Sequence, residues 1–205
     1  MRPQRRGEET RNRILQAAEE GFAQNGYEAT GVAEICQRAH LSKGAFYHHF
    51  PSKQAVFLAL LDRWLDDLEA HLKALRTQAA SAPDALLQMA DVAREVFHAA
   101  RGRLPVFLEF LNKAARDPRV WQATIIPYRR YRAFFASLME AGVAEGSLRH
   151  VDPEAAANAL LSLAVGLVLQ GVMDPDGADW GDIARESVRL LLEGILRPGA
   201  QAAGQ

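Results

Sequence analysis

The sequence predicts an all-α protein with about nine helices. Apolar residues recur at helical spacing nearly throughout the chain, and no convincing alternating run of the kind that marks a half-buried strand occurs. Prolines are scarce inside the apolar segments and fall mainly between them. With 205 residues, of which 49% are hydrophobic, the chain suits one large domain or a small domain joined to a medium one.

The first helix is expected between about Thr10 and Asn25. Apolar side chains recur there at every fourth position and make one buried stripe, formed by Ile14, Ala18 and Phe22. Gly26 follows the last turn, where a glycine commonly ends a helix. Only the two ends of the chain, residues 1–8 and 198–205, are expected to be disordered.

Two short helices follow the first one. The second opens at Thr30 or Gly31 and carries a single apolar face, formed by Val32, Ile35, Cys36 and Ala39. After the short turn "AHLS", Ser42 is a good N-cap for a third helix over residues 43–49, because its hydroxyl can accept a bond from a free amide of the first turn.

The remaining helices are longer. Pro51 ends the third helix, and Ser52 caps a fourth that reaches about residue 80. Turn-forming segments then divide the rest into five helices, at about 84–100, from 105, at 120–145, after 152 and at 183–196. Pro127 lies inside the helix at 120–145 and is expected to kink it.

Charge is distributed unevenly along the chain, although the formal net charge is only -1. The residues up to Ala55 carry a net charge of about +2 and the remainder about −3, which suggests an anionic partner for the first part alone. Cys36 is the sole cysteine, so no internal disulfide is possible, as is usual in a reducing cytoplasm. The polar, arginine-rich start lacks the apolar stretch of a signal peptide, and a cytoplasmic protein is expected.

The stretch "HLSKGAFYHHFPSK", residues 40–53, concentrates histidines, lysines and aromatic rings. Two short helices that a tight turn joins, packed on a preceding helix, describe a helix-turn-helix, whose second helix enters the DNA major groove. Phe46 and Phe50 would face the core. Four residues on the other side of this helix can face DNA: Lys43 and Tyr47, and Gly44 and His48. Lysine suits phosphate, tyrosine and histidine can bond phosphate or base edges, and glycine permits close backbone approach.

Residues 10–61 resemble the tetracycline-repressor (TetR) family of bacterial regulators. The resemblance is carried by a helix that ends in "NGYEAT" and by the following "SKGAFYHHFPSK". It implies a DNA-binding domain at residues 1–53 and an effector-binding and dimerisation domain at 54–205. It also implies that the DNA-contact positions are Thr30, Ser42, Lys43, Gly44, Tyr47, His48 and Lys53. Gly31 departs from the family pattern, which usually has Thr or Ser there, and this removes one possible phosphate contact.

The last two helices are expected to form a homodimer. Small side chains permit close helix approach along the first of them, at Ala155, Ala159, Ser162 and Gly166, and the last helix has an apolar stripe, at Ala184, Val188, Leu191 and Ile195. Two such helices from each of two chains would make a four-helix interface. A membrane span at residues 155–173 is disfavoured, because polar residues interrupt it and its flanks are acidic.

The middle helices are candidates for an effector site, since the family typically binds small apolar or amphipathic molecules there. The candidate lining residues are Trp64, Phe107, Phe110, Leu111, Trp121, Ile125, Tyr128, Arg129 and Arg132. Any one of the apolar residues could equally belong to an ordinary core. The arginines of "PYRRYR", which include Arg130, are either a solvated face or a site for the phosphate or carboxylate of an acyl-coenzyme A.

Metal, cofactor and catalytic sites are not expected. Cys36, His40, His48 and His49 match no zinc spacing, and "DPDGADWGD" has Ala178 and Asp179 where a calcium loop needs an oxygen donor and a glycine. No nucleophile elbow, phosphate loop or dinucleotide fingerprint occurs. The sequence therefore favours a ligand-responsive repressor that binds a near-palindromic double-stranded operator. The alternative is an effector-independent DNA-binding or architectural protein of the same fold.

Overall fold

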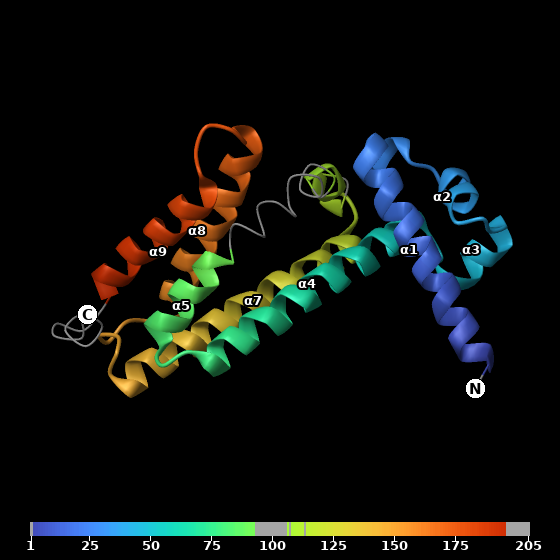
Figure 1. Ribbon diagram of the computed structural model, residues 1–205. Coiled ribbons are helices and arrows are strands. Elements are labelled where there is room, and N and C mark those ends of the chain that lie inside the picture. The colour runs from blue at the N-terminus through green and yellow to red at the C-terminus, as the bar shows by residue number, and fades with distance from the viewer. Residues whose placement is uncertain (1, 93–105, 107, 113, 196–205) are drawn as a thin grey trace. The chain divides into compact units, whose positions relative to one another are not determined.

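The structure is a computed structural model that describes residues 2–92, 106, 108–112 and 114–195 (Figure 1). These residues confirm the all-α class, since they form helices and no sheet. The helices are α1 (Arg2–Ala29), α2 (Val32–Arg38), α3 (Lys43–His49), α4 (Lys53–Gln78), α5 (Ala82–Asp91), α7 (Pro118–Glu145), α8 (Pro153–Met173) and α9 (Trp180–Ile195). Residues 106, 108–112 and 114 are also helical, and we call them the 108–112 helix.

The chain divides into two compact units. The first comprises Met1–Asp67 and Gly102–Pro127, and the second comprises Leu68–Arg101 and Tyr128–Gln205. Helices α4 and α7 contribute residues to both units. The first unit contains all of residues 1–53 and adds the start of α4, the 108–112 helix and the start of α7. The division of functions at residue 53 stays a prediction.

Helix α1 is longer than the sequence pattern predicts. The expectation of disorder over residues 1–8 is wrong for residues 2–8, which continue the helix toward the N-terminus. The expected break at Gly26 is present, because this residue has a φ of 83° inside the helix, in the left-handed region that favours glycine.

The expected caps of the next helices are confirmed. The Ser42 hydroxyl accepts a bond from the Ala45 amide at 3.1 Å, and the Ser52 hydroxyl accepts one from the Ala55 amide at 3.1 Å. Helix α3 has the predicted bounds. Gly31 is the N-cap of α2 and makes no side-chain cap, which is the physical consequence of lacking the usual hydroxyl.

The core of the first unit draws on distant parts of the sequence. Helices α1 to α4 supply most of its buried side chains, among them Ile14, Phe22, Ile35, Phe46 and Phe57. The 108–112 helix adds a stripe at every fourth position, formed by Val106, Phe110 and Ala114. The apolar surface of the helix-turn-helix is therefore covered in part by residues that follow it by more than fifty positions.

Tyr27 lies in this core and is 1% exposed. Burial, followed by the charges of Glu28 and Glu109, raises its pKa from 10.0 to about 12. The Tyr27 hydroxyl therefore loses its proton less readily in the folded state than in the unfolded state. The resulting contribution to the free energy of unfolding is present in full below pH 10 and is lost as the pH rises to about 12.

We therefore expect the free energy of unfolding to fall by up to about 2–3 kcal/mol across this window. Tyr27→Phe should remove this part of the alkaline loss. Denaturant titrations between pH 9 and 12 would measure it. An identical alkaline loss in the variant would contradict the assignment.

The helices after residue 80 depart from prediction mainly at their ends. Helix α5 begins at Ala82 because the Ser81 hydroxyl accepts from the Asp84 amide. Helix α9 begins at Trp180, where an Asp179 carboxylate oxygen accepts from the amides of Gly181 and Asp182. Helix α7 runs continuously across Pro127, and the kink there stays a prediction. The predicted segments at 93–100, at 105 and at 198–205 lie outside the described residues.

In the second unit, α9 packs against α5 and α8. Its buried side is formed by Ala184, Val188 and Leu192. The Arg149 guanidinium donates to the Gly194 carbonyl at 3.0 Å, and the Arg149 amide donates to the Ile195 carbonyl at 2.9 Å. These bonds satisfy carbonyls in the last turn of α9, which have no partner within the helix.

Gly142 allows α7 to approach its neighbours closely. A Cβ atom there would lie 2.6 Å from a methyl carbon of Leu148 and 2.9 Å from the Ala82 Cβ, both in buried side chains. We expect Gly142→Ala to lower the free energy of unfolding by about 1–3 kcal/mol, because overpacking must displace these groups.

Gly194→Ala is the matched control, since no atom lies within 4 Å of a Cβ at that helical glycine. Alanine there should be neutral or stabilising by up to about 1 kcal/mol. Thermal unfolding of both variants measures the difference, and equal stability would contradict the close approach.

Candidate nucleic-acid interface

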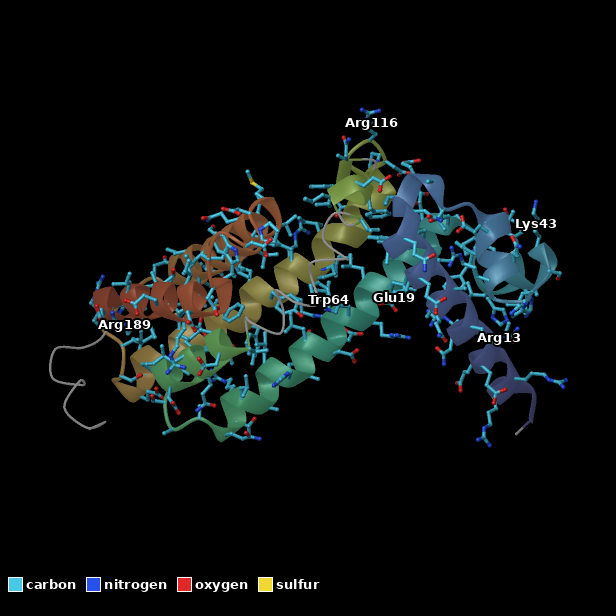
Figure 2. The ribbon with its side chains drawn as sticks, turned by 45° about the horizontal axis from the view of Figure 1, so that its top comes forward. Arg13, Glu19, Lys43, Trp64, Arg116 and Arg189 are labelled. Carbon is cyan, nitrogen blue, oxygen red and sulfur yellow. The ribbon has the colours of Figure 1, made fainter. Side chains whose placement is uncertain are left out.

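Helix α3 presents one polar face to solvent. Lys43, Gly44 and His48 are exposed, and the Tyr47 side chain is 55% exposed. The opposite side is anchored in the core through Phe46 and Phe50, whose rings lie 6.3 Å apart. Figure 2 shows Lys43 projecting outward from the helix-turn-helix. Four of the predicted contact residues thus lie on one surface, and the cap residue Ser42 is exposed beside them.

The turn between α2 and α3 is fixed by hydrogen bonds to α1 and to α2. His40 has a φ of 51°, an unusual conformation for a residue other than glycine. The Arg13 guanidinium donates to the carbonyls of Ala39 and His40, the second at 3.3 Å. The Leu41 amide donates to the Cys36 carbonyl at 2.9 Å. The exposed face of α3 is therefore held at a set angle to α1, as a surface that docks in a groove requires.

Two predicted contact residues are engaged inside the chain. Thr30 is 0% exposed, and its hydroxyl donates to the Gly26 carbonyl at 2.9 Å. The Lys53 ammonium donates to the Tyr27 carbonyl at 2.6 Å and lies 4.4 Å from the centre of the Tyr27 ring. Spacing in the sequence could not show that these side chains turn inward. The burial of Thr30 corrects the expectation that its side chain contacts DNA, while contact of the partly exposed Lys53 with DNA stays a prediction.

The basic start of α1 lies near the end of α3 and was missed by the site prediction. Arg5 and Arg6 are exposed. A Cβ at Gly7 would lie 4.0 Å from the His49 ring, and the Arg11 guanidinium lies 5.0 Å from the centre of the Phe50 ring. The sequence signal for this basic surface is the cluster of arginines before residue 14.

Cys36, which lies close to three histidines in the sequence, belongs to the core of the first unit. Cys36 is buried, and burial raises the pKa of its thiol, with the Lys43 charge acting in the opposite direction. Among the described residues, no group of three or more histidine, cysteine, aspartate or glutamate side chains is placed to hold a metal ion.

The candidate effector residues are spread over both units. Trp64, Leu111 and Ile125 are half-buried in the first unit, where Trp121 is 39% exposed. Phe110 packs in the core of the first unit. Tyr128 is 42% exposed and belongs to the second unit. Phe107 lies outside the described residues. A shared effector site stays a prediction.

The arginines of "PYRRYR" are mostly paired with acidic side chains. Arg130 forms an ion pair with Glu69 at 2.5 Å, and Arg132 forms one with Glu154 at 3.3 Å. Arg129 is exposed. The pairs match the expectation of a solvated face better than a preformed site for phosphate, because the acidic partners would compete with an anionic ligand.

Helix α8 carries an exposed face of small and apolar residues. Its members share helical spacing: Ala155, Ala159, Ser162, Val165, Leu169 and Met173. Val165 is 59% exposed and Met173 is 76% exposed, which is unusual for such side chains. Gly166 is half-buried beside this face. The predicted small-residue ridge therefore lies at the surface of this chain.

The predicted stripe on α9 is divided. Ala184 and Val188 are buried within the second unit. Val188 is therefore not exposed for contact with a second copy of the chain, which corrects the expectation that it lies at the dimer interface. Leu191 and Ile195 are half-buried, and Leu190 is exposed. Periodicity identified an apolar face, but it could not show that part of this face packs within the same chain.

A groove of about 440 Å³ lies between the start of α8 and the end of α9. It is lined by Arg149, His150, Val151, Asp152, Ala155, Ala156, Ala159, Leu191 and Ile195. Four of these residues, Ala155, Ala159, Leu191 and Ile195, are among those predicted for the dimer interface. None of its lining residues is among those predicted for the effector.

Among the described helices, α8 alone is long and apolar enough to cross a membrane by length and composition. Only 28% of its most apolar stretch is buried in the chain. The helix packs against α9, and its N-cap is Asp152, whose carboxylate accepts from the Ala155 amide at 2.7 Å. A dimer interface on this helix stays a prediction.

Family models match both parts of the chain. Residues 14–60 match the model for bacterial regulatory proteins of the tetR family, and residues 88–197 match the model for the C-terminal part of BetI-type transcriptional repressors. The second match covers more than half of the chain. The chain therefore belongs to the TetR family of bacterial regulators. It is a DNA-binding transcriptional regulator and not an enzyme.

Similar proteins extend the match to nearly the full length. The chain is 30% identical to the A-factor receptor protein of Streptomyces griseus, over 98% of this chain and 69% of that protein. It is 28% identical to the regulator UidR of Escherichia coli strain K12, over 91% of this chain and 93% of that protein. A transcriptional regulator from Saccharomonospora viridis, solved in complex with choline, has the same fold, with a TM-score of 0.79 and 24% identity over 93% of this chain and 99% of that one.

Proposed function

We propose that the protein is a ligand-responsive repressor that binds a near-palindromic operator as a homodimer. The observation that carries this proposal is the exposed polar face of α3, capped by Ser42 and held by Arg13. A recognition helix anchored in this way can enter the major groove with its N-terminal residues foremost. The proposed contacts are Ser42, Lys43, Gly44, Tyr47 and His48.

Arg5 and Arg6 extend the proposed contact surface. They are exposed on the turn of α1 that approaches His49, so they can reach phosphates that flank the groove occupied by α3. Contacts of this kind add affinity without sequence preference and make binding dependent on salt.

The proposed dimer uses the exposed face of α8 with the neighbouring surface of α9. An apolar face of this extent would be costly to leave in water, and a second copy of the chain covers it with a matching face in a two-fold arrangement. Two recognition helices about 34–36 Å apart can then dock in successive turns of one DNA face. Such a dimer acts in the cytoplasm, without a membrane, where DNA is accessible.

The proposed effector is a small organic molecule that binds the body of the protein. The S. griseus relative is named as the receptor of A-factor, and the S. viridis regulator was solved with choline, which supports a small-molecule effector for this chain. An acyl-coenzyme A stays a prediction, and the ion pairs of Arg130 and Arg132 count against it. The ring of Tyr128, which is 42% exposed in the second unit, suits an apolar or quaternary ammonium group.

The proposed mechanism links effector and operator through α4. Its first residue, Lys53, bonds to the end of α1, and its later turns belong to the second unit. An effector releases DNA only if it binds more tightly to a conformation in which the distance between the two recognition helices does not match the distance between the half-sites. The alternative, an effector-independent DNA-binding protein of the same fold, requires no such difference.

Operator affinity with and without an effector tests this proposal. Fluorescence anisotropy of a labelled operator duplex would be measured with choline and with palmitoyl-coenzyme A, after calorimetry has shown which of them binds. We expect a bound effector to weaken operator affinity about tenfold or more, the usual scale of allosteric coupling. A ligand that binds and leaves operator affinity unchanged at saturation would contradict release and favour the alternative.

A further inference from the structure

A single carboxylate holds the junction between α1 and α2. One oxygen of Glu109 accepts a bond from the Tyr27 amide at 2.8 Å, and the other accepts one from the Glu28 amide at 2.7 Å. Glu109 belongs to the 108–112 helix, so these bonds join segments about eighty residues apart in the sequence. All of the groups lie within the first unit.

The backbone at this junction suits a carboxylate. The left-handed conformation of Gly26 interrupts α1, and the amides that follow the break lie where the first turn of a helix leaves amides without carbonyl partners. A charged acceptor makes stronger bonds to such amides than a neutral one. A Cβ at Gly26 would lie 3.1 Å from the Glu109 carboxylate, so glycine also gives the carboxylate room to approach.

The same backbone segment is held from its carbonyl side. The Lys53 ammonium donates to the carbonyls of Tyr27 and Glu28, at 2.6 Å and 3.2 Å. Glu109 therefore binds the amides of two residues whose carbonyls bind the first residue of α4. The last residues of α1 are fixed between two other helices of the first unit.

Apolar packing reinforces the bonds of Glu109. The next residue, Phe110, stacks on Phe57 of α4 with the ring centres 4.1 Å apart. It also meets the Tyr27 ring edge-on at 5.4 Å. Adjacent residues of one helix thus supply a polar and an apolar contact to the same junction.

We propose that Glu109 is a positioning residue through which the 108–112 helix determines where α2 and α3 lie. The junction it binds leads directly into the N-cap of α2, and α2 sets the place of α3 through their shared turn. The consequence of this positioning role for regulation rests on the proposed function. An effector that displaces the 108–112 helix would withdraw the carboxylate and free the recognition helix of that subunit.

Amide hydrogen exchange of the DNA-free protein, measured by nuclear magnetic resonance at neutral pH, tests the proposal directly. In Glu109→Ala, we expect the Tyr27 and Glu28 amides to exchange at least about tenfold faster, because a bond to a charged acceptor is lost. The amides of α2 and α3 should also lose protection. Glu109→Gln should give a smaller change, since its amide oxygen can still accept one bond.

Two control variants separate positioning from general destabilisation. Glu20→Gln makes the same change of charge at an exposed glutamate of α1 whose carboxylate accepts a bond from the Gln16 side-chain amide at 3.1 Å, and it should leave α2 and α3 unchanged. Leu86→Ala removes a buried side chain from the second unit, so it lowers overall stability without touching the junction. It should not loosen α2 and α3 selectively.

Unchanged protection of α2 and α3 in both Glu109 variants would overturn the positioning role, even if the Tyr27 and Glu28 amides exchange faster. A loss as large in Leu86→Ala as in the Glu109 variants would also overturn it. Because exchange is measured without DNA, failure of the wild-type protein to bind any operator would refute the proposed function separately. If an operator is bound, Glu109→Ala should weaken that affinity about threefold to tenfold while random duplex binds as before.

Discussion

Replacing Lys43 and Tyr47 together by alanine is expected to lower operator affinity by about two orders of magnitude or more. Each subunit loses a cation suited to phosphate and a ring that can bond phosphate or a base edge, and contacts to bases are each worth about 1–3 kcal/mol. Both side chains are exposed, so the fold should be unaffected. In a dimer the slope of log affinity against log salt should also become shallower by about 2, because two phosphate contacts are removed.

A matched control changes the same residue types elsewhere. Lys73 and Tyr128 are also exposed, and they lie in the second unit. The double variant Lys73→Ala/Tyr128→Ala should bind the operator as the wild type does. Gel shifts over a range of salt concentrations measure both variants. Equal operator affinity in the Lys43/Tyr47 variant and the wild type would show that α3 does not contact DNA through this face.

Placing two negative charges on α8 is expected to separate the dimer. In Val165→Glu/Leu169→Glu, the two-fold axis brings four new carboxylates to the interface, where they would lose water and repel one another. The free subunit should stay folded, since Val165 and Leu169 are exposed in it. Sedimentation should show a monomer at micromolar concentration. Operator affinity should fall at least about a hundredfold, because each subunit then binds one half-site alone.

Ile126→Glu provides the control for this prediction. Ile126 is 59% exposed, the same fraction as Val165, but it belongs to the first unit. The control should remain a dimer and keep its operator affinity. A dimer that persists in the α8 variant would place the subunit interface elsewhere.

The sequence predicted the helix-turn-helix in detail because its signals are local. Ser42 and Ser52 cap the helices that directly follow them, Pro51 separates those helices, and Gly26 breaks α1. Phe46 and Phe50 point into the core as their spacing indicated. In each of these cases the residues that decide the structure lie within a few positions of it.

The sequence could not predict contacts between distant segments. Helical spacing showed that Val188 lies on an apolar face, but not that this face packs within its own chain. Lys53 is a cation near the recognition helix, but its bonds to the end of α1 depend on the folded backbone. Glu109 has an unremarkable sequence context, and its role arises because Gly26 leaves two amides for it to bind.

Binding of the purified protein to the DNA immediately upstream of its own coding region tests the central claim most directly, since regulators of this kind often control neighbouring genes. A footprint combined with gel shifts at several salt concentrations would be measured. We expect two protected half-sites one helical turn or a multiple of it apart, with a salt slope of about −5 if Arg5, Arg6 and Lys43 of both subunits contact phosphate. Binding no tighter than to random duplex, across that region and a genomic library of fragments, would contradict the assignment of α3 as a sequence-specific recognition helix.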